Sequence, residues 1–147
     1  MIIALGCDHG ALELKNIIIK HLEQKGFDTI DCGTNSTDSC DYSDFAEKVC
    51  ALVKTGEADL GILICGTGIG MSMAANKIDG IRCALCGDVF SAKATRSHND
   101  ANVLALGARV VGVGLALEIV DAYLGTSFSR EQRHINRIKK VMELEKK

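Results

Sequence analysis

The stretch of the chain with the most evident chemistry is Cys65-Gly66-Thr67-Gly68-Ile69-Gly70, in which a thiol precedes three glycines at alternate positions. Glycines spaced in this way at the start of a helix can expose successive backbone N–H groups into one concavity, which suits an anion. A thiol beside such a concavity meets a field that stabilises its thiolate, and a thiolate is a nucleophile or a base. The stretch therefore predicts an anion site with a reactive cysteine, or else only a tight turn that needs small residues.

Two familiar glycine motifs do not fit this stretch. The dinucleotide fingerprint needs glycines at its first, third and sixth positions, but the glycines here fall at 66, 68 and 70, and Met71 takes the sixth position. The P-loop fails as well, because no Gly-Lys-Ser/Thr follows. An anion that forms only during a reaction, such as an enediolate, is a suitable occupant, since it would be stabilised without tight binding of the ground state.

Alternating apolar and amphipathic segments predict the elements that position this stretch. Strands are expected at 2–7, 27–32, 59–65, 81–87 and 102–107. A helix after the first strand is expected to end near Lys25, and further helices are expected at 44–56, 71–77, 88–98, 115–124 and 129–147. Ser43 is expected to cap the helix at 44–56, and Ser129 to open the last one. This alternation predicts an α/β fold: a Rossmann-like three-layer α/β/α sandwich with a five-stranded parallel sheet, plus a C-terminal helix.

Ligands bind at the carboxyl ends of the strands in sheets of this kind. Two turns of interest follow such ends, namely residues 7–10 after the first strand and residues 65–70 after the third. If these two strands are neighbours, the two turns face each other. That edge of the sheet is the candidate site.

The bulk composition excludes several classes of protein. The 147 residues are expected to form a single domain, 1–147, with ordinary proportions of hydrophobic (47%) and charged (24%) residues. A net charge of −2 indicates no nucleic-acid partner and no attraction to an acidic membrane. No apolar run is long enough to span a membrane. The first ten residues lack a basic segment and contain Asp8, so they do not resemble a signal peptide, and a cytoplasmic location is expected.

The seven cysteines are expected to be reduced thiols, because no export signal accompanies them. Zinc binding is the competing interpretation. The single Cys-x-x-Cys pair, Cys83 and Cys86, lies within an expected strand, where side chains three positions apart point to opposite faces. No second pair completes a ligand set, so we expect no metal.

Two further groups have chemistry of interest. Residues 98–102, His-Asn-Asp-Ala-Asn, form a dense polar cluster before the last strand, although a histidine there is often only a cation at a helix C-terminus. Arg133 and Arg137 lie four positions apart on the last helix and share a face. They form either a solvated surface or a clamp for a phosphate group.

Four stretches taken in order resemble the ribose-5-phosphate isomerase B family, which includes related galactose-6-phosphate and allose-6-phosphate isomerases. They are GCDHGALELK (6–15), DCGTNSTDSCDYSDFA (31–46), CGTGIGMSMAANK (65–77) and RSHNDANVLALGARVVG (96–112), and they cover most of the chain. Ser43 stands where a proline is expected in the family, which alters a loop but no chemical group.

The resemblance implies interconversion of D-ribose 5-phosphate and D-ribulose 5-phosphate through a cis-enediol, without metal or cofactor. Cys65 would be the base, Thr67 would support ring opening, and His98 would open the furanose. Some members of the family carry a glutamate base at the position of Met71, which cannot serve here. The groups expected to bind the sugar phosphate are Asp8, His9, Tyr42, Gly66, Gly68, Ile69, Gly70, Asn99, Arg109, Arg133 and Arg137, with the amides of 66–70 holding the enediolate.

The expected position of His98 has a consequence for assembly. Cys65 ends the third strand, whereas His98 precedes the fifth, so in a parallel sheet they lie at opposite edges, about 16 Å apart. A catalytic His98 would therefore enter the site from a second subunit, which predicts a homodimer, or a dimer of dimers, with shared sites.

Three alternatives remain open from the residues. The substrate could be a six-carbon sugar phosphate, such as allose 6-phosphate or galactose 6-phosphate. The protein could be a non-catalytic module that binds a sugar phosphate or a nucleotide. It could also be a cysteine hydrolase, with Cys65 as nucleophile and His98 as base.

Overall fold

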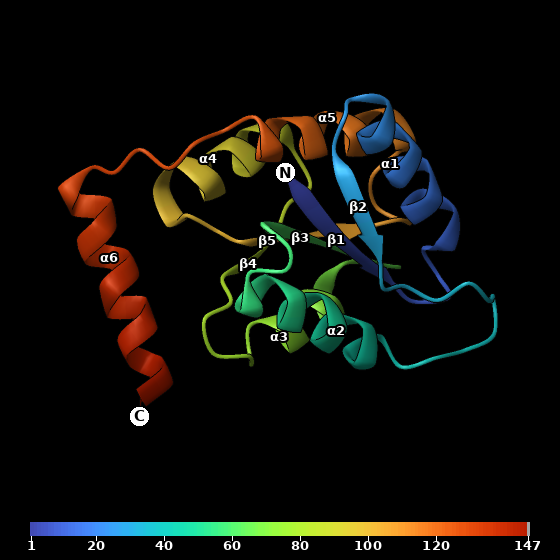
Figure 1. Cartoon of the computed structure of the whole chain (residues 1–147), viewed down its shortest axis with the longest axis horizontal. Helices are drawn as coiled ribbons and strands as arrows, with labels where there is room; N and C mark the ends of the chain where they lie inside the picture. Colours follow the sequence, from blue (N-terminus) through green and yellow to red (C-terminus); the bar gives the residue numbers. More distant parts are fainter. Residues whose placement is uncertain (147) are drawn as a thin grey trace.

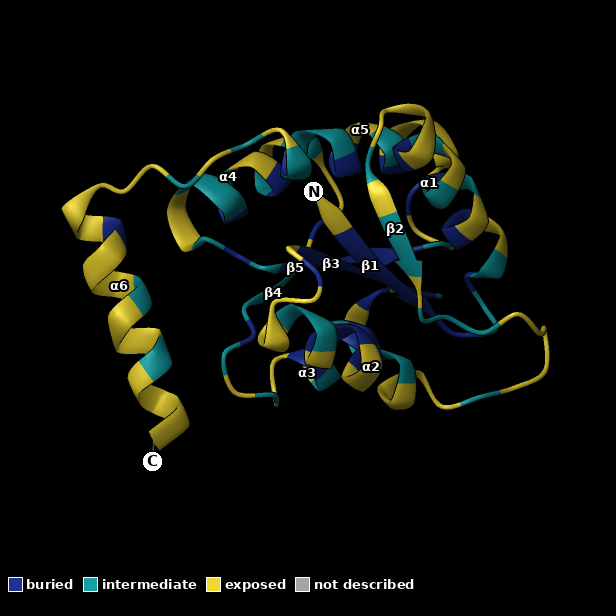
Figure 2. Cartoon of the chain, viewed as in Figure 1, coloured by how far each residue is buried: buried dark blue, intermediate teal, exposed yellow. Residues whose placement is uncertain are grey.

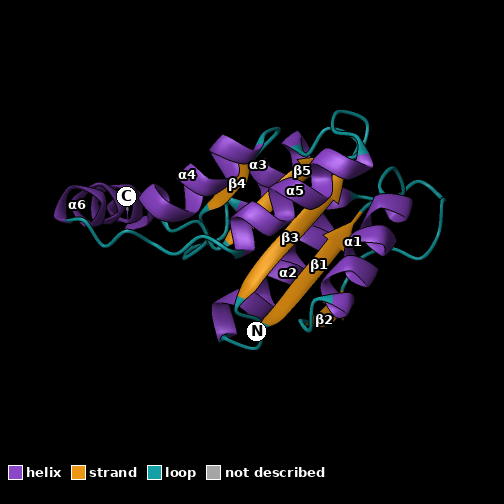
Figure 3. Cartoon of the chain, turned by 90° about the horizontal axis from the view of Figure 1, so that it is seen from above, coloured by secondary structure: helices purple, strands orange, loops and turns teal. Residues whose placement is uncertain are grey.

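Five parallel strands form the middle layer of the protein, in the order β2-β1-β3-β5-β4 (Figures 1 and 3). The computed structural model describes residues 1–146. The strands are β1 (Ile2–Cys7), β2 (Asp28–Asp31), β3 (Leu60–Cys65), β4 (Cys83–Leu85) and β5 (Val103–Gly107). The helices are α1 (Leu12–Gln24), α2 (Tyr42–Thr55), α3 (Ile69–Ala75), α4 (Val89–Asn99), α5 (Val113–Leu124) and α6 (Gln132–Met142), followed by a 3-10 turn, η1 (Glu143–Lys146).

Helices cover both faces of the sheet, so the predicted three-layer α/β/α fold is confirmed. Figure 1 shows α1, α4 and α5 on one face and α2 and α3 on the other. The central strands are apolar throughout because both of their faces are buried, as the dark ribbon of β1 and β3 shows in Figure 2. β1 and β3 are neighbours, with Cys7 aligned to Ile64, so the two turns that follow them lie at one edge of the sheet.

The last helix, α6, stands away from the three layers (Figures 1 and 3). Its surface is largely exposed (Figure 2). Ile135 and Val141 on this helix, and Leu144 just after it, remain exposed although they are apolar. Among the helices of residues 1–146, none is both long enough and apolar enough to cross a membrane.

Two expected helix starts are wrong. Ser43 does not cap α2, because the helix begins one residue earlier, at Tyr42, and Asp41 occupies the cap position. Ser129 does not open α6, which begins at Gln132. The Ser129 hydroxyl accepts the Glu131 N–H (3.2 Å) and lies 2.7 Å from His134 Nδ1, so it forms a turn before the helix instead.

A buried lysine anchors the long loop between β2 and α2. The Lys15 side chain is fully buried, and its Nζ donates to Asp31 Oδ2 (2.7 Å) and to the carbonyl of Thr34 (3.1 Å). The Asp31 carboxylate also accepts the Gly33 N–H (2.9 Å). A buried ammonium is tolerated only when its hydrogen bonds are satisfied, and here loop atoms satisfy them.

Replacing Lys15 by methionine should therefore destabilise the protein, because Asp31 and the Thr34 carbonyl lose their common partner. Asp31 is about one-third exposed and can be rehydrated, so we expect a loss of about 2–3 kcal/mol. Chemical denaturation measures this loss. Lys20→Met, which removes an exposed lysine from the same helix, is the control, and equal effects of the two substitutions would contradict the prediction.

Candidate active site

A cavity of about 220 Å³ opens at the carboxyl edge of the sheet, where β1 and β3 end. Its walls come from the turn after β1, the start of α2, the loop after β3 and the segment after β5. The lining residues are Asp8, His9, Gly10, Tyr42, Cys65, Gly66, Thr67, Gly70 and Arg109. Eight positions expected to take part in chemistry or binding, namely 8, 9, 42, 65, 66, 67, 70 and 109, thus meet in one place.

The sulfur of Cys65 lies at the base of the loop that follows β3. Cys65 is the last residue of the strand and is 5% exposed. Its Sγ accepts the N–H of Gly68 at 3.1 Å. An N–H that points at sulfur stabilises negative charge there, which suits a thiol that must act as a thiolate. Gly68 reaches this position with a φ of +76°, and a Cβ on it would lie 2.8 Å from the Leu106 carbonyl carbon.

The loop amides divide into two sets. The N–H groups of Gly68 and Ile69 donate within the loop, to Cys65 Sγ and to Thr67 Oγ1 (3.3 Å) respectively. Within residues 1–146, no protein acceptor takes a hydrogen bond from the amides of Gly66, Thr67 or Gly70. Since α3 has only seven residues, its dipole is small, and these free amides are the main positive feature of the loop.

Tyr42 and Asp8 close two sides of the cavity. The Tyr42 ring lies against Gly70, where a Cβ would come within 2.6 Å of the ring carbon Cζ, so a larger residue at position 70 would displace the ring. Asp8 is 8% exposed, and its Oδ1 accepts the Gly10 N–H at 2.9 Å. This bond fixes the carboxylate at the rim, where its other oxygen can accept from a hydroxyl group.

His9 is oriented by a residue that the sequence did not single out. The Cys40 N–H donates to His9 Nδ1 (3.3 Å), and the Cys40 thiol lies 3.7 Å from the same nitrogen. With Nδ1 used as an acceptor, the neutral imidazole carries its proton on Nε2 and can donate through it. Cys40 belongs to a polar loop without periodicity, so no sequence signal pointed to this contact.

Arg109 brings a cation to the same edge. The backbone N–H of Arg109 donates to the Gly66 carbonyl (2.9 Å). The Arg109 side chain runs past Gly66, and its Cδ lies 3.5 Å from the position that a Cβ would occupy on Gly66. The guanidinium therefore lies next to the free loop amides. Together they form a region that attracts an anionic group such as a phosphate.

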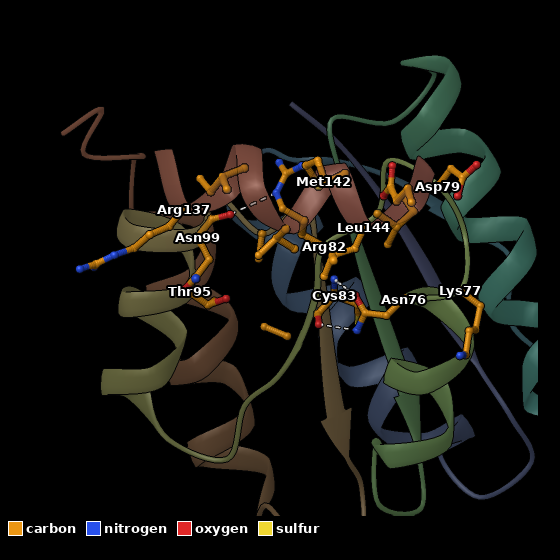
Figure 4. Close-up of a pocket in the computed structure, with 16 residues that line it drawn as sticks. Asn76, Lys77, Asp79, Arg82, Cys83, Thr95, Asn99, Arg137, Met142 and Leu144 are labelled. Carbon is orange, nitrogen blue, oxygen red and sulfur yellow. Dashed lines mark hydrogen bonds between the residues drawn. The ribbon is translucent and has the colours of Figure 1, made fainter. Parts of the chain in front are cut away.

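Six of the expected residues do not line this cavity: Gly68 and Ile69 of the loop itself, and His98, Asn99, Arg133 and Arg137 elsewhere in the chain. His98 and Asn99 are the last residues of α4, which returns from the carboxyl end of β4 towards the amino end of β5. Asn99 and Arg137 line a second cavity, of about 650 Å³, between α6 and the sheet (Figure 4). His98, Asn99, Arg133 and Arg137 are all exposed. The chain therefore carries two separate groups of candidate residues.

Comparison with known proteins identifies the family. Residues 3–141 match the family model described as Ribose/Galactose Isomerase. The chain belongs to this isomerase family. It is 48% identical to ribose-5-phosphate isomerase B of Escherichia coli, over 99% of this chain and 97% of that protein. The resemblance inferred from the sequence and the isomerase class are thereby confirmed.

Two other members of the isomerase family show that the fold is shared and that members are named for different substrates. The structure of Clostridium thermocellum ribose-5-phosphate isomerase B matches with a TM-score of 0.97 and 51% identity, over 99% of this chain and 98% of that one. A D-erythrulose-4-phosphate isomerase of Pectobacterium atrosepticum is 46% identical, over 86% of this chain and 84% of that protein. The same fold therefore occurs in proteins named for sugar phosphates of different length.

Burial affects the pKa of several cysteines of this isomerase in the same direction. Burial raises the pKa of Cys7 to about 11, that of Cys50 to about 12 and that of Cys86 to about 11, so these thiols stay protonated. Burial also raises the pKa of Cys83.

Within residues 1–146, no group of three or more His, Cys, Asp or Glu side chains lies close enough to hold a metal ion.

His134, which the sequence reasoning missed, packs against His98. The two rings have centroids 4.5 Å apart, and His134 is buried. The signal available in the sequence was its position between Arg133 and Arg137 on one helix. Burial lowers the pKa of His134, and the neighbouring His98, Arg133 and Arg137 lower it further, against an opposing effect of Glu131.

This shift makes folding stability depend on pH. The folded protein holds His134 neutral, whereas the unfolded chain takes up the proton near its ordinary pKa of 6.5, so stability is lost as the pH falls below about 6.5. Unfolding free energies measured between about pH 7.5 and pH 5 should fall less steeply for His134→Gln than for the unaltered protein. Parallel curves would show that His134 does not contribute to the pH dependence.

Proposed function

We propose that this chain interconverts D-ribose 5-phosphate and D-ribulose 5-phosphate through a cis-enediolate, with the Cys65 thiolate as base. The observation that carries the proposal is the position of the Cys65 sulfur, which accepts the Gly68 N–H inside a cavity lined by unoccupied loop amides. The thiolate takes the proton from C2 of the open-chain aldose and returns it to C1. The proton of the C2 hydroxyl moves to the C1 oxygen, which balances the reaction.

The free amides of Gly66, Thr67 and Gly70 suit the oxygen that becomes negative in the enediolate. A proton next to an aldehyde is weakly acidic, so this charge needs stabilisation, and one well-placed donor supplies roughly 3–4 kcal/mol. The Thr67 hydroxyl accepts from Ile69 N–H, so its own proton is free for a substrate oxygen. Asp8 and Tyr42 then contact the sugar hydroxyl groups.

Metal plays no part in this proposal, and neither does any other cofactor. Proton transfer by a positioned base contributes a factor of about 10²–10⁴. Cys65 and the amides therefore supply both parts that the reaction needs: a base and a site for the negative oxygen.

We assign ring opening to His98, with Asn99 beside it, and binding of the phosphate to Arg109, Arg133 and Arg137. The β5 strand of five residues spans about 16 Å, so His98 of the same chain does not reach Cys65. His98 and the two arginines of α6 therefore act at the site of a second subunit. A homodimer with C2 symmetry then has two equivalent shared sites.

The surface of the single chain supports this arrangement. The exposed apolar residues Ile135, Val141 and Leu144, and the cavity of about 650 Å³ beneath α6, lie beside the exposed catalytic candidates. A second copy would cover this apolar surface while it receives His98. The free cysteines of the described chain support a reducing, cytoplasmic location.

The proposal also specifies the sugar, which is a five-carbon aldose phosphate. A relative named for a four-carbon substrate shares 46% identity with this chain, so substrates of other lengths are a second candidate. A panel of four-, five- and six-carbon aldose phosphates, assayed for ketose formation, ranks them. If kcat/KM is highest for ribose 5-phosphate, the result supports our proposal. If it is highest for allose 6-phosphate or galactose 6-phosphate, that sugar phosphate replaces ribose 5-phosphate as the proposed substrate.

Replacing Cys65 by alanine should abolish exchange of solvent hydrogen at C2 and lower kcat by a factor of at least about 10². Binding of the sugar phosphate, measured by calorimetry, should persist, because the amides and Arg109 remain. Cys32→Ala, which removes a half-buried thiol outside the cavity, is the control. EDTA should leave the activity unchanged. Full activity of Cys65→Ala, or loss of activity in EDTA, would refute the mechanism.

Complementation tests the shared site. Cys65→Ala and His98→Ala chains are each expected to be inactive as homodimers. After subunit exchange, a mixed dimer has one site with both residues intact and should show about half the normal activity per dimer. Mixed dimers that form, as seen by native mass spectrometry, yet remain inactive would place His98 outside the catalytic site or within its own chain.

A further inference from the structure

Arg82, just before β4, occupies a position where three parts of the chain meet. Its side chain is about one-fifth exposed and lies at the wall of the cavity beneath α6. Figure 4 shows it with Asn99 on one side and Met142 on the other. Nothing in its sequence context distinguished it, and it takes no part in the mechanism proposed above.

The Arg82 guanidinium binds the carbonyl groups at the end of α4. Nε donates to the carbonyls of Asn99 and Asp100, each at 3.1 Å, and Nη2 donates to the Asp100 carbonyl at 2.7 Å. Figure 4 shows the bond to Asn99. The last carbonyls of a helix lack partners within the helix. Arg82 supplies those partners at the residue next to His98.

The backbone of Arg82 is itself held firmly. Its N–H donates to Asn102 Oδ1 (2.8 Å), and its carbonyl accepts the Asn102 N–H (3.1 Å). Asn102 Nδ2 also donates to the Gly80 carbonyl (2.8 Å). The guanidinium therefore extends from a segment that is fixed to the start of β5.

The turn that Arg82 holds is an unusual one. Asp100 adopts the left-handed conformation, with φ of +44°, and its carboxylate lies between Arg96 Nη1 (2.8 Å) and Arg82 Nη2 (3.5 Å). On its other side, Arg82 Nη1 contacts Met142 Sδ of α6 at 3.7 Å. One side chain thus joins the end of α4 to the helix that carries Arg133 and Arg137.

We infer that Arg82 is a positioning residue, which sets the orientation in which His98 and Asn99 enter the site of the second subunit. The inference rests on the proposed function, because that function is what has His98 and Asn99 act across a subunit interface. His98 and Asn99 are exposed in the single chain, so the backbone of the turn, together with the packing of His98 on His134, sets their direction. A shift of about 1 Å in such groups can cost about 10²-fold in rate.

Arg82→Met keeps the aliphatic stem and removes the donors to Asn99 and Asp100. We expect kcat for ribose 5-phosphate to fall by at least about 10-fold, with a smaller change in KM. Arg82→Lys, which retains the charge but reaches fewer carbonyls, should lie between. Lys54→Met, which removes an exposed positive charge from the end of α2, is the control and should keep normal kinetics.

Subunit exchange distinguishes positioning from a general structural role. In a mixed dimer of Arg82→Met and Cys65→Ala chains, one site combines the intact Cys65 face of the first chain with the intact His98 of the second. Activity should then rise to about half that of the unaltered dimer, well above either homodimer. A defect of Arg82→Met in its own Cys65 site, or in folding, would not be rescued in this way.

The mixture of Cys65→Ala with His98→Ala serves as the reference. If that mixture regains activity and the Arg82→Met mixture does not, the inference about Arg82 is overturned while the shared site stands. Normal kcat in the Arg82→Met homodimer would overturn it as well. If both mixtures stay inactive, the shared site itself is wrong, and the inference falls with it. Should Arg82→Met fail to form dimers, Arg82→Lys takes its place in the same mixing experiment.

Discussion

In a parallel sheet every connection must carry the chain from the carboxyl edge of one strand back to the amino edge of the next, and most features of this protein follow from that constraint. The turns after β1, β3 and β5 all begin at one edge, which brings Asp8, Cys65 and Arg109 together. The end of α4 lies towards the other edge, because the next strand must start there. The constraint thus brings one group of candidate residues together and separates the other group from it.

At the carboxyl edge the loops are held in place by close packing around glycines and by a buried charged side chain, and not by regular secondary structure. Glycine is required where Gly68 approaches the Leu106 backbone, and Gly70 leaves room for the Tyr42 ring. The buried ammonium of Lys15 ties down the loop after β2, and Cys40 of that loop orients His9. The cavity is therefore organised before any ligand arrives, which keeps small the reorganisation needed when charge develops in the transition state.

At the other group of residues the arrangement is reversed, because the candidate side chains are exposed and the residues that support them are buried or partly buried. His98 stacks on the buried His134, and Arg82 satisfies the carbonyls of the turn that follows. In the function proposed above, His98 acts once the surface of a second subunit covers it. The free face of α6 and the cavity beneath it have the apolar character that such a cover needs.

The sequence by itself determined the alternation of strands and helices, the parallel sheet, the Cys65 loop and the family, because each of these depends on residues that are near one another in the chain or on motifs of fixed spacing. It did not determine the start of α2, which begins before Ser43, or that of α6, where the Ser129 hydroxyl contacts Glu131 N–H and His134 in a turn ahead of the helix. The role of Cys40 beside His9 and that of Arg82 beside Asn99 were decided only by the tertiary structure. These pairs lie far apart in sequence, and their contacts arise from how a loop and a helix end pack against the sheet, which no local periodicity encodes.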